Sequence, residues 1–365
     1  MRDLQRVTFW AALLVATTSA LPVLAEDGGY VQHNLVSDLP GMADKTDPNL
    51  VNAWGIDRSA TSPWWVNGNG TGVSILYNGS GTPFPVASPL VVTVPPPAGG
   101  AGPSTPTGVV FNGTTDFQLA TGAPARFLFA TEDGTISGWN PAVNPTNAVI
   151  EVDNSPMAVY KGIAPGVMGG KNVLYAANFR GGTVDVFDGS FAPVALAAGM
   201  FQDERIPEGY APFNVANIGG SIFVTYAKQD PTKHDDVAGP GRGFLDEYTP
   251  DGTLVMRFRH GPWMNSPWGV EMAPAGFGKL SGRLLLGNFG SGQIASFDPS
   301  SGEFEGMLHG RHERPITIDG LWGIKFGNGA NAGPANVLFF SAGIQDEAHG
   351  LFGTLTFVPG KDHGK

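Results

Sequence analysis

The 365-residue chain contains no cysteine, which excludes disulfides, thiolate metal sites, iron–sulfur clusters and cysteine nucleophiles. Beyond its first 25 residues it also lacks any apolar run of 18 residues, so we predict no transmembrane segment. Basic residues are scarce, because 21 Lys and Arg stand against 32 Asp and Glu, giving a formal net charge of −11. This balance argues against nucleic acid and anionic membranes as partners, since both attract basic surfaces.

The first 25 residues have the three-part layout of a secretory signal peptide. Arg2 and Arg6 form a basic lead, an apolar run extends from Val7 to Ala20, and compact residues precede a predicted cleavage after Ala25. A buried N-terminal helix is the alternative. We therefore predict a signal peptide over residues 1–25, export to the periplasm or the medium, and one mature domain over residues 26–360.

Glycine and proline are abundant, with 53 and 30 residues, yet 42% of the chain is hydrophobic. Disordered chains lack that apolar content. Long helical periodicity is missing from the mature part. Many short strands joined by Gly- and Pro-rich turns would give this composition, so the sequence predicts an all-β fold.

A short pattern recurs six times along the chain and fixes the predicted architecture. Its anchor is a Gly, or an Asn in the fourth unit, followed directly by Ile or Val; in three units a Pro stands two residues before the anchor. The anchor residue of each unit lies 52 to 55 residues after the previous one, at Gly55, Gly108, Gly162, Asn214, Gly269 and Gly323. Apolar runs and Asn-, Asp- and Gly-rich turns follow each anchor at similar spacing.

Four strands in a unit of about 50 residues is the blade of a β-propeller. We predict six four-stranded antiparallel blades near residues 50–94, 106–152, 156–200, 211–259, 266–308 and 320–358. The last unit lacks a fourth strand, and residues 30–36 read as a spare one, so we expect that N-terminal strand to close the ring. An open pair of β-sandwiches and a β-helix are the alternatives, and the even repeat length disfavours both.

The anchors, each followed by an apolar strand and a Gly-rich turn, resemble NHL-type propellers. Longer stretches resemble a family of exported bacterial proteins without an established activity, namely Asn34–Gly41, Asp47–Asn52, His234–Gly241 and Asp319–Ile324. The resemblance covers nearly the whole mature chain. It implies the propeller fold and export, and it transfers no catalytic residue.

The residue before each anchor is the first candidate for a binding site. Ligands of propellers sit where inner strands and loops converge at the mouth of the central channel. Five of these six positions carry the predicted ligand-binding residues Trp54, Lys161, Phe213, Trp268 and Trp322. Facing the channel, they would form an aromatic ring with one cation, suited to a glycan, a peptide or another small molecule. The alternative is that they pack between adjacent blades.

A divalent cation such as calcium is the second candidate. Lactonase-type six-bladed propellers hold such an ion in the channel through oxygen ligands, and hard cations prefer carboxylate, amide and carbonyl oxygens. Asn52, Asn214 and Asp319 are the predicted ligands. Asn and Asp are also ordinary turn residues, which is the alternative. An enlarged loop over residues 228–243, rich in Asp and containing His234, is either a binding loop or a solvated charged loop.

No nucleophile elbow and no phosphate-binding loop motif occurs in the sequence. The leading hypothesis is therefore an exported binding or scaffold propeller with its ligand at the channel mouth. One alternative is a divalent-metal-assisted hydrolase or lyase of the lactonase-like type. A second is a cell-surface or matrix interaction protein, which would need a broad apolar patch outside the channel.

Overall fold

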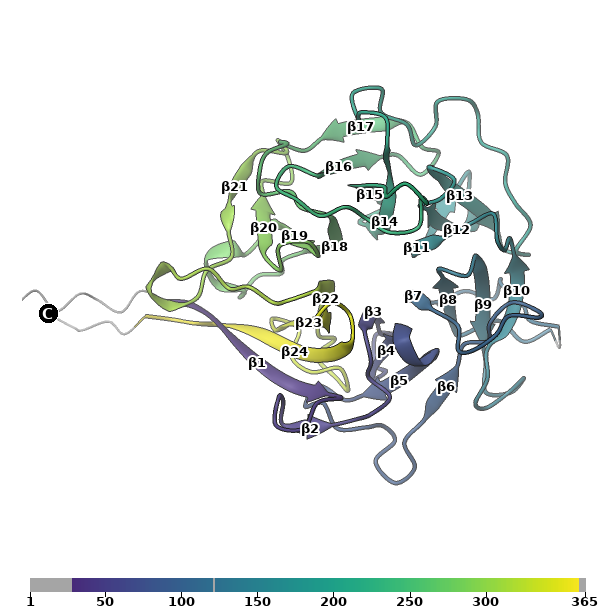
Figure 1. Cartoon of the computed structure of the whole chain (residues 1–365), viewed down its shortest axis with the longest axis horizontal. Helices are drawn as coiled ribbons and strands as arrows, with labels where there is room; N and C mark the ends of the chain where they lie inside the picture. The colour runs from purple at the N-terminus through teal and green to yellow at the C-terminus, as the bar shows by residue number, and fades with distance from the viewer. Residues whose placement is uncertain (1–27, 121, 361–365) are drawn as a thin grey trace, which may run out of the picture.

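The computed structural model describes residues 28–120 and 122–360, so the predicted signal peptide lies outside the described part of the chain. Six sheets of mainly antiparallel strands surround a central axis, with β3, β7, β11, β14, β18 and β22 as their innermost strands (Figure 1). The predicted all-β six-bladed propeller is thereby confirmed. None of the helices in the described residues is long and apolar enough to cross a membrane.

The first three blades follow one another around the ring. Blade 1 contains β3 (Ala53–Asp57), β4 (Trp64–Gly68), β5 (Val73–Tyr77) and β6 (Val91–Thr93). Blade 2 contains β7 (Pro106–Phe111), β8 (Phe127–Thr131), β9 (Thr135–Trp139) and β10 (Val149–Asp153). Blade 3 contains β11 (Tyr160–Met168), β12 (Lys171–Asn178) and β13 (Thr183–Asp188), and its outer edge is extended by a single bridge from Pro193 to Phe187.

The next two blades have four strands each, and the last one is composite. Blade 4 contains β14 (Tyr210–Ile218), β15 (Ser221–Lys228), β16 (Gly243–Tyr248) and β17 (Leu254–Arg257). Blade 5 contains β18 (Pro267–Met272), β19 (Leu284–Asn288), β20 (Ile294–Phe297) and β21 (Phe304–Met307). Blade 6 contains β22 (Leu321–Phe326), β23 (Leu338–Ile344), β24 (His349–Val358) and the N-terminal β1 (Gly29–Ser37), with the short β2 (Lys45–Thr46) at its edge.

The ring is closed by the N-terminal strand, as predicted. β1 pairs antiparallel with β24, from Gly29 opposite Val358 to Ser37 opposite Leu351. The last blade thus takes its outer strand from the start of the domain, and β24 exposes no unpaired edge. Figure 1 shows the purple and yellow strands lying side by side.

The anchor residues explain how the inner strands can lie so close together. The pairing register of each inner strand shifts next to its anchor, so all six carry an irregularity at the same level. A Cβ on Gly108 would lie 2.8 Å from the backbone nitrogen of Ile163 in the next blade, and one on Gly323 would lie 3.0 Å from the carbonyl oxygen of Trp54. Glycine is needed because the neighbouring backbone occupies the space of a side chain.

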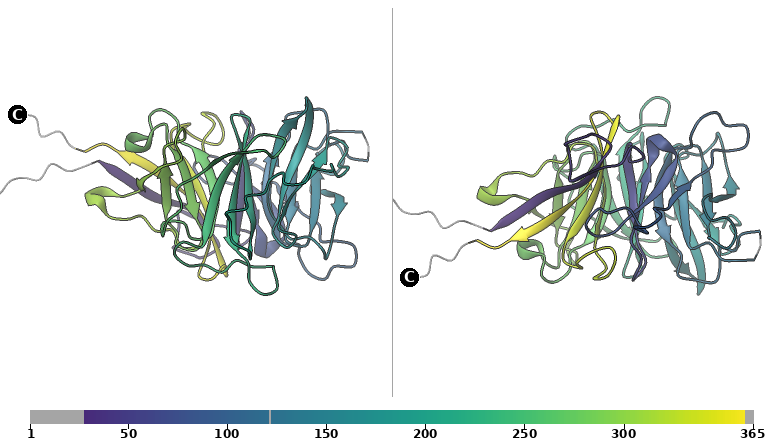
Figure 2. Two further views of the ribbon diagram at one scale, coloured as in Figure 1. Left: turned by 90° about the horizontal axis from the view of Figure 1, so that it is seen from above. Right: turned by 90° about the horizontal axis from the view of Figure 1, so that it is seen from below.

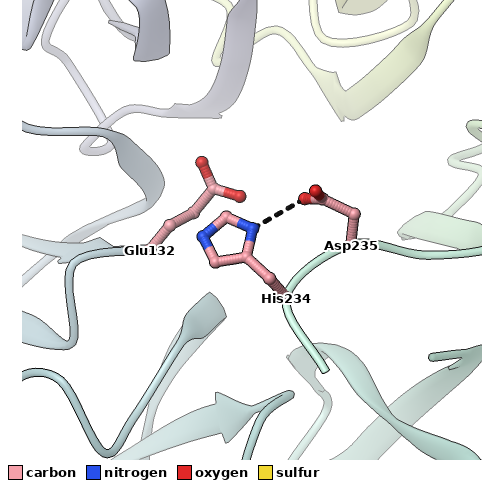
Figure 3. A group of neighbouring side chains, drawn as sticks. All are labelled: Glu132, His234 and Asp235. Carbon is pink, nitrogen blue, oxygen red and sulfur yellow. Dashed lines mark hydrogen bonds and ion pairs between the residues drawn. The ribbon is translucent and has the colours of Figure 1, made fainter. Parts of the chain in front are cut away.

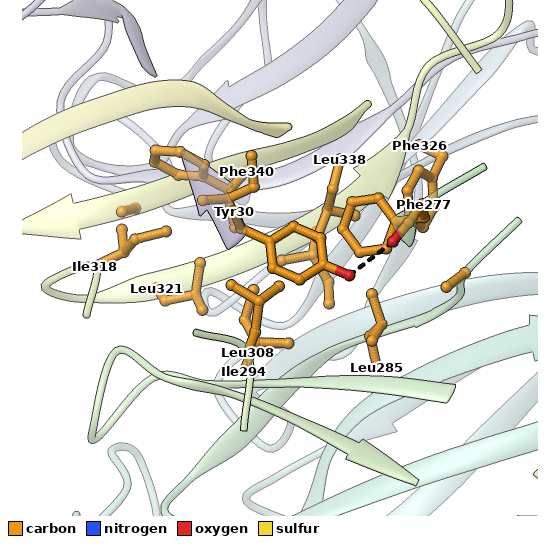
Figure 4. Close-up of a cluster of buried hydrophobic side chains, with 14 of the residues drawn as sticks. Tyr30, Phe277, Leu285, Ile294, Leu308, Ile318, Leu321, Phe326, Leu338 and Phe340 are labelled. Carbon is orange, nitrogen blue, oxygen red and sulfur yellow. Dashed lines mark hydrogen bonds between the residues drawn. The ribbon is translucent and has the colours of Figure 1, made fainter. Parts of the chain in front are cut away.

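Most of the apolar core lies between adjacent blades. Figure 4 shows one such cluster, in which Leu285 and Ile294 of blade 5 pack against Leu321 and Leu338 of blade 6. Tyr30 of the closing strand inserts its ring here, and its hydroxyl donates a 2.6 Å hydrogen bond to the carbonyl of Phe277. The closing strand is therefore held by side-chain packing as well as by its backbone pairing.

Seen from the side, the ring of blades is a disc with two faces (Figure 2). Every inner strand begins at one face and ends at the other, because each blade is entered through its inner strand. The turn between the second and third strands of each blade returns to the starting face. This face, with the six inner-strand starts and these six turns, is termed the loop face, and the other is termed the opposite face.

Candidate functional site

An aromatic plug fills the channel just below the loop face. It consists of Trp54, Phe213, Trp268, Trp322 and Phe289. The Trp322 ring stacks on Trp54, with centroids 3.7 Å apart, and on Phe289, at 3.9 Å. The Trp268 indole donates a 2.9 Å hydrogen bond across the axis to the carbonyl of Lys161. The four aromatic residues selected from the sequence therefore do meet at the axis.

These aromatic rings are buried, so they do not form the open ring that a stacked ligand would need. Trp54 is 2% exposed and Trp322 is 1% exposed. One neighbour of the Trp54 ring is Trp322, and the Lys161 ammonium lies 5.2 Å from the centroid of Trp54. Their role as direct ligand-binding residues remains a prediction, and their packing makes them the floor beneath a polar layer.

That polar layer is termed the loop-face cluster. Its members come from five blades and gather around the buried ammonium of Lys161; they are Asn52, Asn69, Glu132, Lys161, His234, Asp235, Asp236 and Glu347. Lys161, with a side chain only 2% exposed, forms an ion pair with Glu132. Its Nζ also lies 3.4 Å from Oδ1 of Asp235.

Amides connect the carboxyl groups of the cluster from blade to blade. Nδ2 of Asn52 donates to Glu347 at 2.9 Å and to Asn69 at 3.2 Å. Nδ2 of Asn69 in turn donates to Glu132 at 2.9 Å. The chain of contacts thus runs from blade 6 through blades 1 and 2 to Lys161 in blade 3 and Asp235 in blade 4.

The enlarged loop of blade 4 supplies the solvent-facing side of the cluster. Asp230 fixes the loop by accepting the backbone N–H of His234 at 2.8 Å, and Nδ1 of His234 lies 2.8 Å from Asp235. Figure 3 shows this imidazole between the carboxyl groups of Glu132 and Asp235, which approach it from different blades. The Asp235 side chain is 67% exposed, so an incoming molecule can reach the cluster from this side.

The electrostatics of the cluster favour positive charge. Burial lowers the pKa of Lys161, but the carboxylates of Glu132, Asp235 and Asp236 more than offset that effect and raise it overall. The hydrogen bond to Asp235 raises the pKa of His234. Burial, with the nearby charge of Glu132, raises the pKa of Glu347 to about 7. Four carboxyl groups thus share one ammonium and one imidazole.

Two buried polar atoms beside the cluster have no protein partner among the described residues. They are Nε1 of Trp54, a donor, and Oδ2 of Asp236, an acceptor. Burial also raises the pKa of Asp236. A buried polar atom without a partner loses its hydration without compensation, so both atoms would gain from a bound molecule.

One subset of the cluster has the spacing of a metal site. Ligand atoms of Glu132, His234 and Asp235 all lie within 4.8 Å of one another. A mixed set of imidazole and carboxylates suits a transition metal such as Mn²⁺ or Zn²⁺ better than calcium, which takes six to eight oxygens. Lys161 already occupies two of these carboxylates, so a metal ion would compete with its ammonium.

The three metal ligands predicted from the sequence have different surroundings. Asn52 belongs to the loop-face cluster. Asn214 lies deeper in the channel and donates through Nδ2 to the carbonyl of Trp268 at 2.8 Å. Asp319 is exposed and accepts the backbone N–H of Gln345 at 2.7 Å. No hydrogen bond within the described chain joins these three residues, and the shared metal site remains a prediction.

Sequence reasoning missed Glu132; it noted Glu347 in a charged loop of the last blade, similar to the loop of blade 4, but did not select it as a site residue. Both lie in turns between the second and third strands of their blades, at Thr131–Thr135 and Ile344–His349. The signal was available in the repeat, because the equivalent turn of blade 4 holds His234 and Asp235, which the sequence did single out. Aligning the six turns would have placed these side chains on one face.

Comparison with known proteins shows that the chain is similar to proteins of a virus. It is 32% identical over 332 residues to the uncharacterized protein R648 of Acanthamoeba polyphaga mimivirus, covering 88% of this chain and 78% of that protein. It is 31% identical over 330 residues to protein L690 of the same virus, covering 88% and 84%. No protein-family profile matches the chain.

The predicted membership of an exported bacterial family is therefore wrong. The relatives that match over most of the chain are viral. The quoted sequence stretches are dominated by Gly, Pro, Asp and Asn, which turns between strands require in any propeller. Such stretches indicate the fold and do not identify a lineage.

Solved structures with a similar fold are also propellers. A streptogramin B lyase matches with a TM-score of 0.52 at 11% identity, covering 91% of this chain and 98% of that one. The virginiamycin B lyase from Staphylococcus aureus gives 0.52 at 12%, covering 91% and 100%. A glucose dehydrogenase gives 0.50 at 12%, covering 89% and 98%. At these identities the likeness concerns the fold alone.

Proposed function

The chain belongs to the family of the mimivirus proteins R648 and L690, and from that premise we propose that it is a binding propeller that captures a small cation at its loop face. The main support for this proposal is the group of four carboxyl side chains around the one buried ammonium of Lys161, namely Glu132, Asp235, Asp236 and Glu347. The shared chemistry of the ligand is positive charge, borne by a metal ion or by an organic ammonium group.

The location of these groups supports a ligand site. Charges that only stabilise a fold are usually paired one to one, whereas here the carboxyl groups outnumber the cations. The cluster lies where all six blades present their turns, above a rigid aromatic floor. Its partnerless buried atoms add a hydrogen-bond donor and an acceptor for the rest of a ligand. Export remains a prediction that rests on residues 1–25 alone.

The test titrates the protein with Mn²⁺ and, separately, with n-butylammonium. Saturable binding of either cation, weakened in Glu347→Gln and Asp235→Asn and unchanged in the control Glu303→Gln, supports the proposal. Glu303 is an exposed carboxyl near blade 5 and outside the cluster. The arm that binds identifies the cation as metal or organic. Binding of neither cation, or equal binding by all variants, contradicts it.

A metal-assisted hydrolase or lyase is the second candidate, favoured by the spacing of Glu132, His234 and Asp235. A divalent ion held there would act as a Lewis acid and make a bound water more acidic. Glu347, whose pKa of about 7 lets it hold or release a proton near neutral pH, would be the general acid or base.

This second candidate has its own test. His234→Ala removes the only nitrogen ligand, so it should abolish Mn²⁺ binding while n-butylammonium binding persists. The Mn²⁺-loaded protein is then assayed for opening of simple lactones and esters. If the Mn²⁺-loaded protein shows no turnover of these substrates, the enzyme hypothesis is wrong, whereas the cation-binding proposal still stands.

The matrix-interaction alternative gains little support. The exposed large hydrophobic side chains of the described residues are single residues from different parts of the ring, such as Val86 in blade 1, Met157 before blade 3 and Val255 in blade 4. Scattered exposed apolar side chains are normal on soluble proteins, and an interaction surface of this kind requires a contiguous patch.

A further inference from the structure

The half of the channel between the aromatic plug and the opposite face encloses a cavity of about 440 Å³, termed the lower chamber. All six inner strands line it, from the anchor residues to the strand ends. Its volume lies within the range of small-molecule pockets in proteins, about 300 to 1,000 Å³. The plug separates it from the loop-face cluster, so it constitutes a different site.

The charges of the lower chamber balance one another. Lys325 of blade 6 pairs with Oδ1 of Asp57 in blade 1 at 2.9 Å, and Oδ2 of Asp57 accepts the N–H of Phe111 in blade 2 at 2.6 Å. Arg58 donates to the carbonyl of Phe326 at 2.8 Å, and Glu271 supplies the remaining negative charge. Two cations face two carboxyl groups, so the chamber does not select for net charge.

Two acceptors of the chamber wall are incompletely satisfied. No donor among the described residues reaches Oδ1 of Asn214, a residue only 7% exposed. Glu271 accepts one hydrogen bond, from the N–H of Met272 at 3.2 Å, and has no ion-pair partner within 4 Å in the described chain. Both residues line the chamber. Glu271 is half-buried, so a molecule in the chamber can reach it. An acceptor that lacks a protein donor in such a chamber favours a ligand that brings one.

Asn214 is the one anchor of the six that is not glycine, which makes it the distinctive feature of this half of the channel. Around it, the position after every anchor carries a β-branched residue that lines the chamber, namely Ile56, Val109, Ile163, Val215, Val270 and Ile324. These side chains form one apolar belt around the chamber, and polar groups make up about half of its exposed lining. Glu271 follows its anchor by two residues, which places it about 7 Å nearer the opposite face than the anchor level.

We propose that the lower chamber is a second binding site, for an uncharged molecule with an apolar body and two hydrogen-bond donors. An alicyclic diol represents this class. One hydroxyl donates to Oδ1 of Asn214 at the inner end, the ring packs on the β-branched wall, and the other hydroxyl donates to Glu271 near the mouth. This site does not depend on the cation site proposed for the loop face.

The experiment uses trans-cyclohexane-1,4-diol as the probe and saturation-transfer NMR as the readout. The control ligand is 1,4-dimethoxycyclohexane, which has the same ring and no donor. We expect the diol to bind at least ten-fold more tightly than the diether. Asn214→Gly and Glu271→Met should each weaken diol binding at least three-fold, and Glu271→Gln, which keeps an acceptor, should restore most of it.

Asn214→Gly copies the anchor of the other five blades, so it is expected to fold; if it does not, the Glu271→Met and Glu271→Gln pair decides alone. The loop-face variant Glu347→Gln serves as the control for location and should bind the diol as the parent protein does. Equal binding of diol and diether, no effect of Glu271→Met, or loss of diol binding in Glu347→Gln would overturn the proposal.

Discussion

The two ends of the channel share one frame of six inner strands, yet they treat charge differently. At the opposite face, Lys325 and Asp57 pair across the junction of blades 6 and 1, and Arg58 ties blade 1 to the carbonyls of blade 6. At the loop face, the carboxyl groups outnumber their cations. Charges on strand ends thus join blades, whereas charges in turns converge on a site.

The aromatic plug separates the two ends of the channel. Removing the indole at the centre of the plug should therefore have the largest effect. Trp322→Ala deletes a 1%-exposed indole that stacks on Trp54 and Phe289. We expect a loss of about 3 to 5 kcal/mol in the free energy of unfolding, because a large cavity is left behind.

Urea unfolding at neutral pH measures this loss. The control is Trp263→Ala, which removes a half-buried indole stacked on Phe304 at the outside of blade 5. The free energy of unfolding should fall clearly less in Trp263→Ala than in Trp322→Ala. Equal losses for the two variants would mean that the plug is no more important than a peripheral aromatic contact.

The two lysines that pair with carboxylates at the ends of the channel, Lys161 and Lys325, provide the next comparison. Lys161→Met leaves Glu132, a side chain 9% exposed, without its cation, so we expect a loss of about 3 kcal/mol or more at neutral pH. Lys325→Met also leaves a buried carboxylate, because the Asp57 side chain is 8% exposed. Its loss should nevertheless be smaller, about 1 to 2 kcal/mol, because the Lys325 side chain is 34% exposed and water can replace its ammonium beside Asp57.

The double variant Glu132→Gln, Lys161→Met removes both members of the loop-face pair and should recover much of the stability that Lys161→Met loses. Thermal and urea unfolding of the four proteins test this together. A Lys325 variant that loses as much stability as the Lys161 variant would remove the proposed difference between the two ends.

Titration with pH sharpens the comparison further. The Glu347 carboxyl, whose pKa is about 7, is mostly neutral at pH 6 and mostly charged at pH 8. Cation affinity should therefore rise from pH 6 to pH 8, by about three- to ten-fold if one carboxylate contributes on the order of 1 kcal/mol. His234, whose pKa is raised by its hydrogen bond to Asp235, loses its positive charge in the same direction. Glu347→Gln should therefore reduce the pH dependence without abolishing it, and Glu271→Gln at the opposite end should leave it unchanged.

The smallest expected effect concerns the exceptional anchor. Asn214→Gly removes one hydrogen bond, to the carbonyl of Trp268, so we expect a loss of about 1 kcal/mol in the free energy of unfolding. Five other blades carry glycine at this level without disruption. A loss several times larger would show that Asn214 has a structural role in joining blades 4 and 5 beyond that bond.

The fold was predictable because each junction between neighbouring blades requires the same residue types at the same positions. Glycine is required where two inner strands approach closely, as at Gly108 and Gly323. The glycines therefore recur in the sequence at the spacing of the blades. The closing strand was predictable for a similar reason, since the last unit lacked a strand. The meeting of Trp54, Trp268 and Trp322 followed from their equal place in the repeat.

Burial and partnership within the site were less predictable. Equivalent positions in the six repeats place side chains at the same height in the channel. They do not determine whether an aromatic ring such as that of Trp322 faces solvent or is buried at the channel axis. Glu132 and Glu347 lie in turns of different length, where no packing rule fixes a common position. Their convergence depends on how each turn folds over the mouth of the channel, and the residues that determine it are spread over five blades.

The pairing of β1 with β24 has a consequence for how this chain can be handled. Because Gly29 lies opposite Val358, residues 28 and 360 are neighbours at the rim, and the β1–β24 seam makes the ring insensitive to which blade comes first. A short linker between those residues would allow new termini in the connection between blades 1 and 2. Such a circular permutant should keep all six sheets and both ends of the channel. Deleting residues 28–37 should instead remove the outer strand of blade 6 and leave β24 with an unpaired edge.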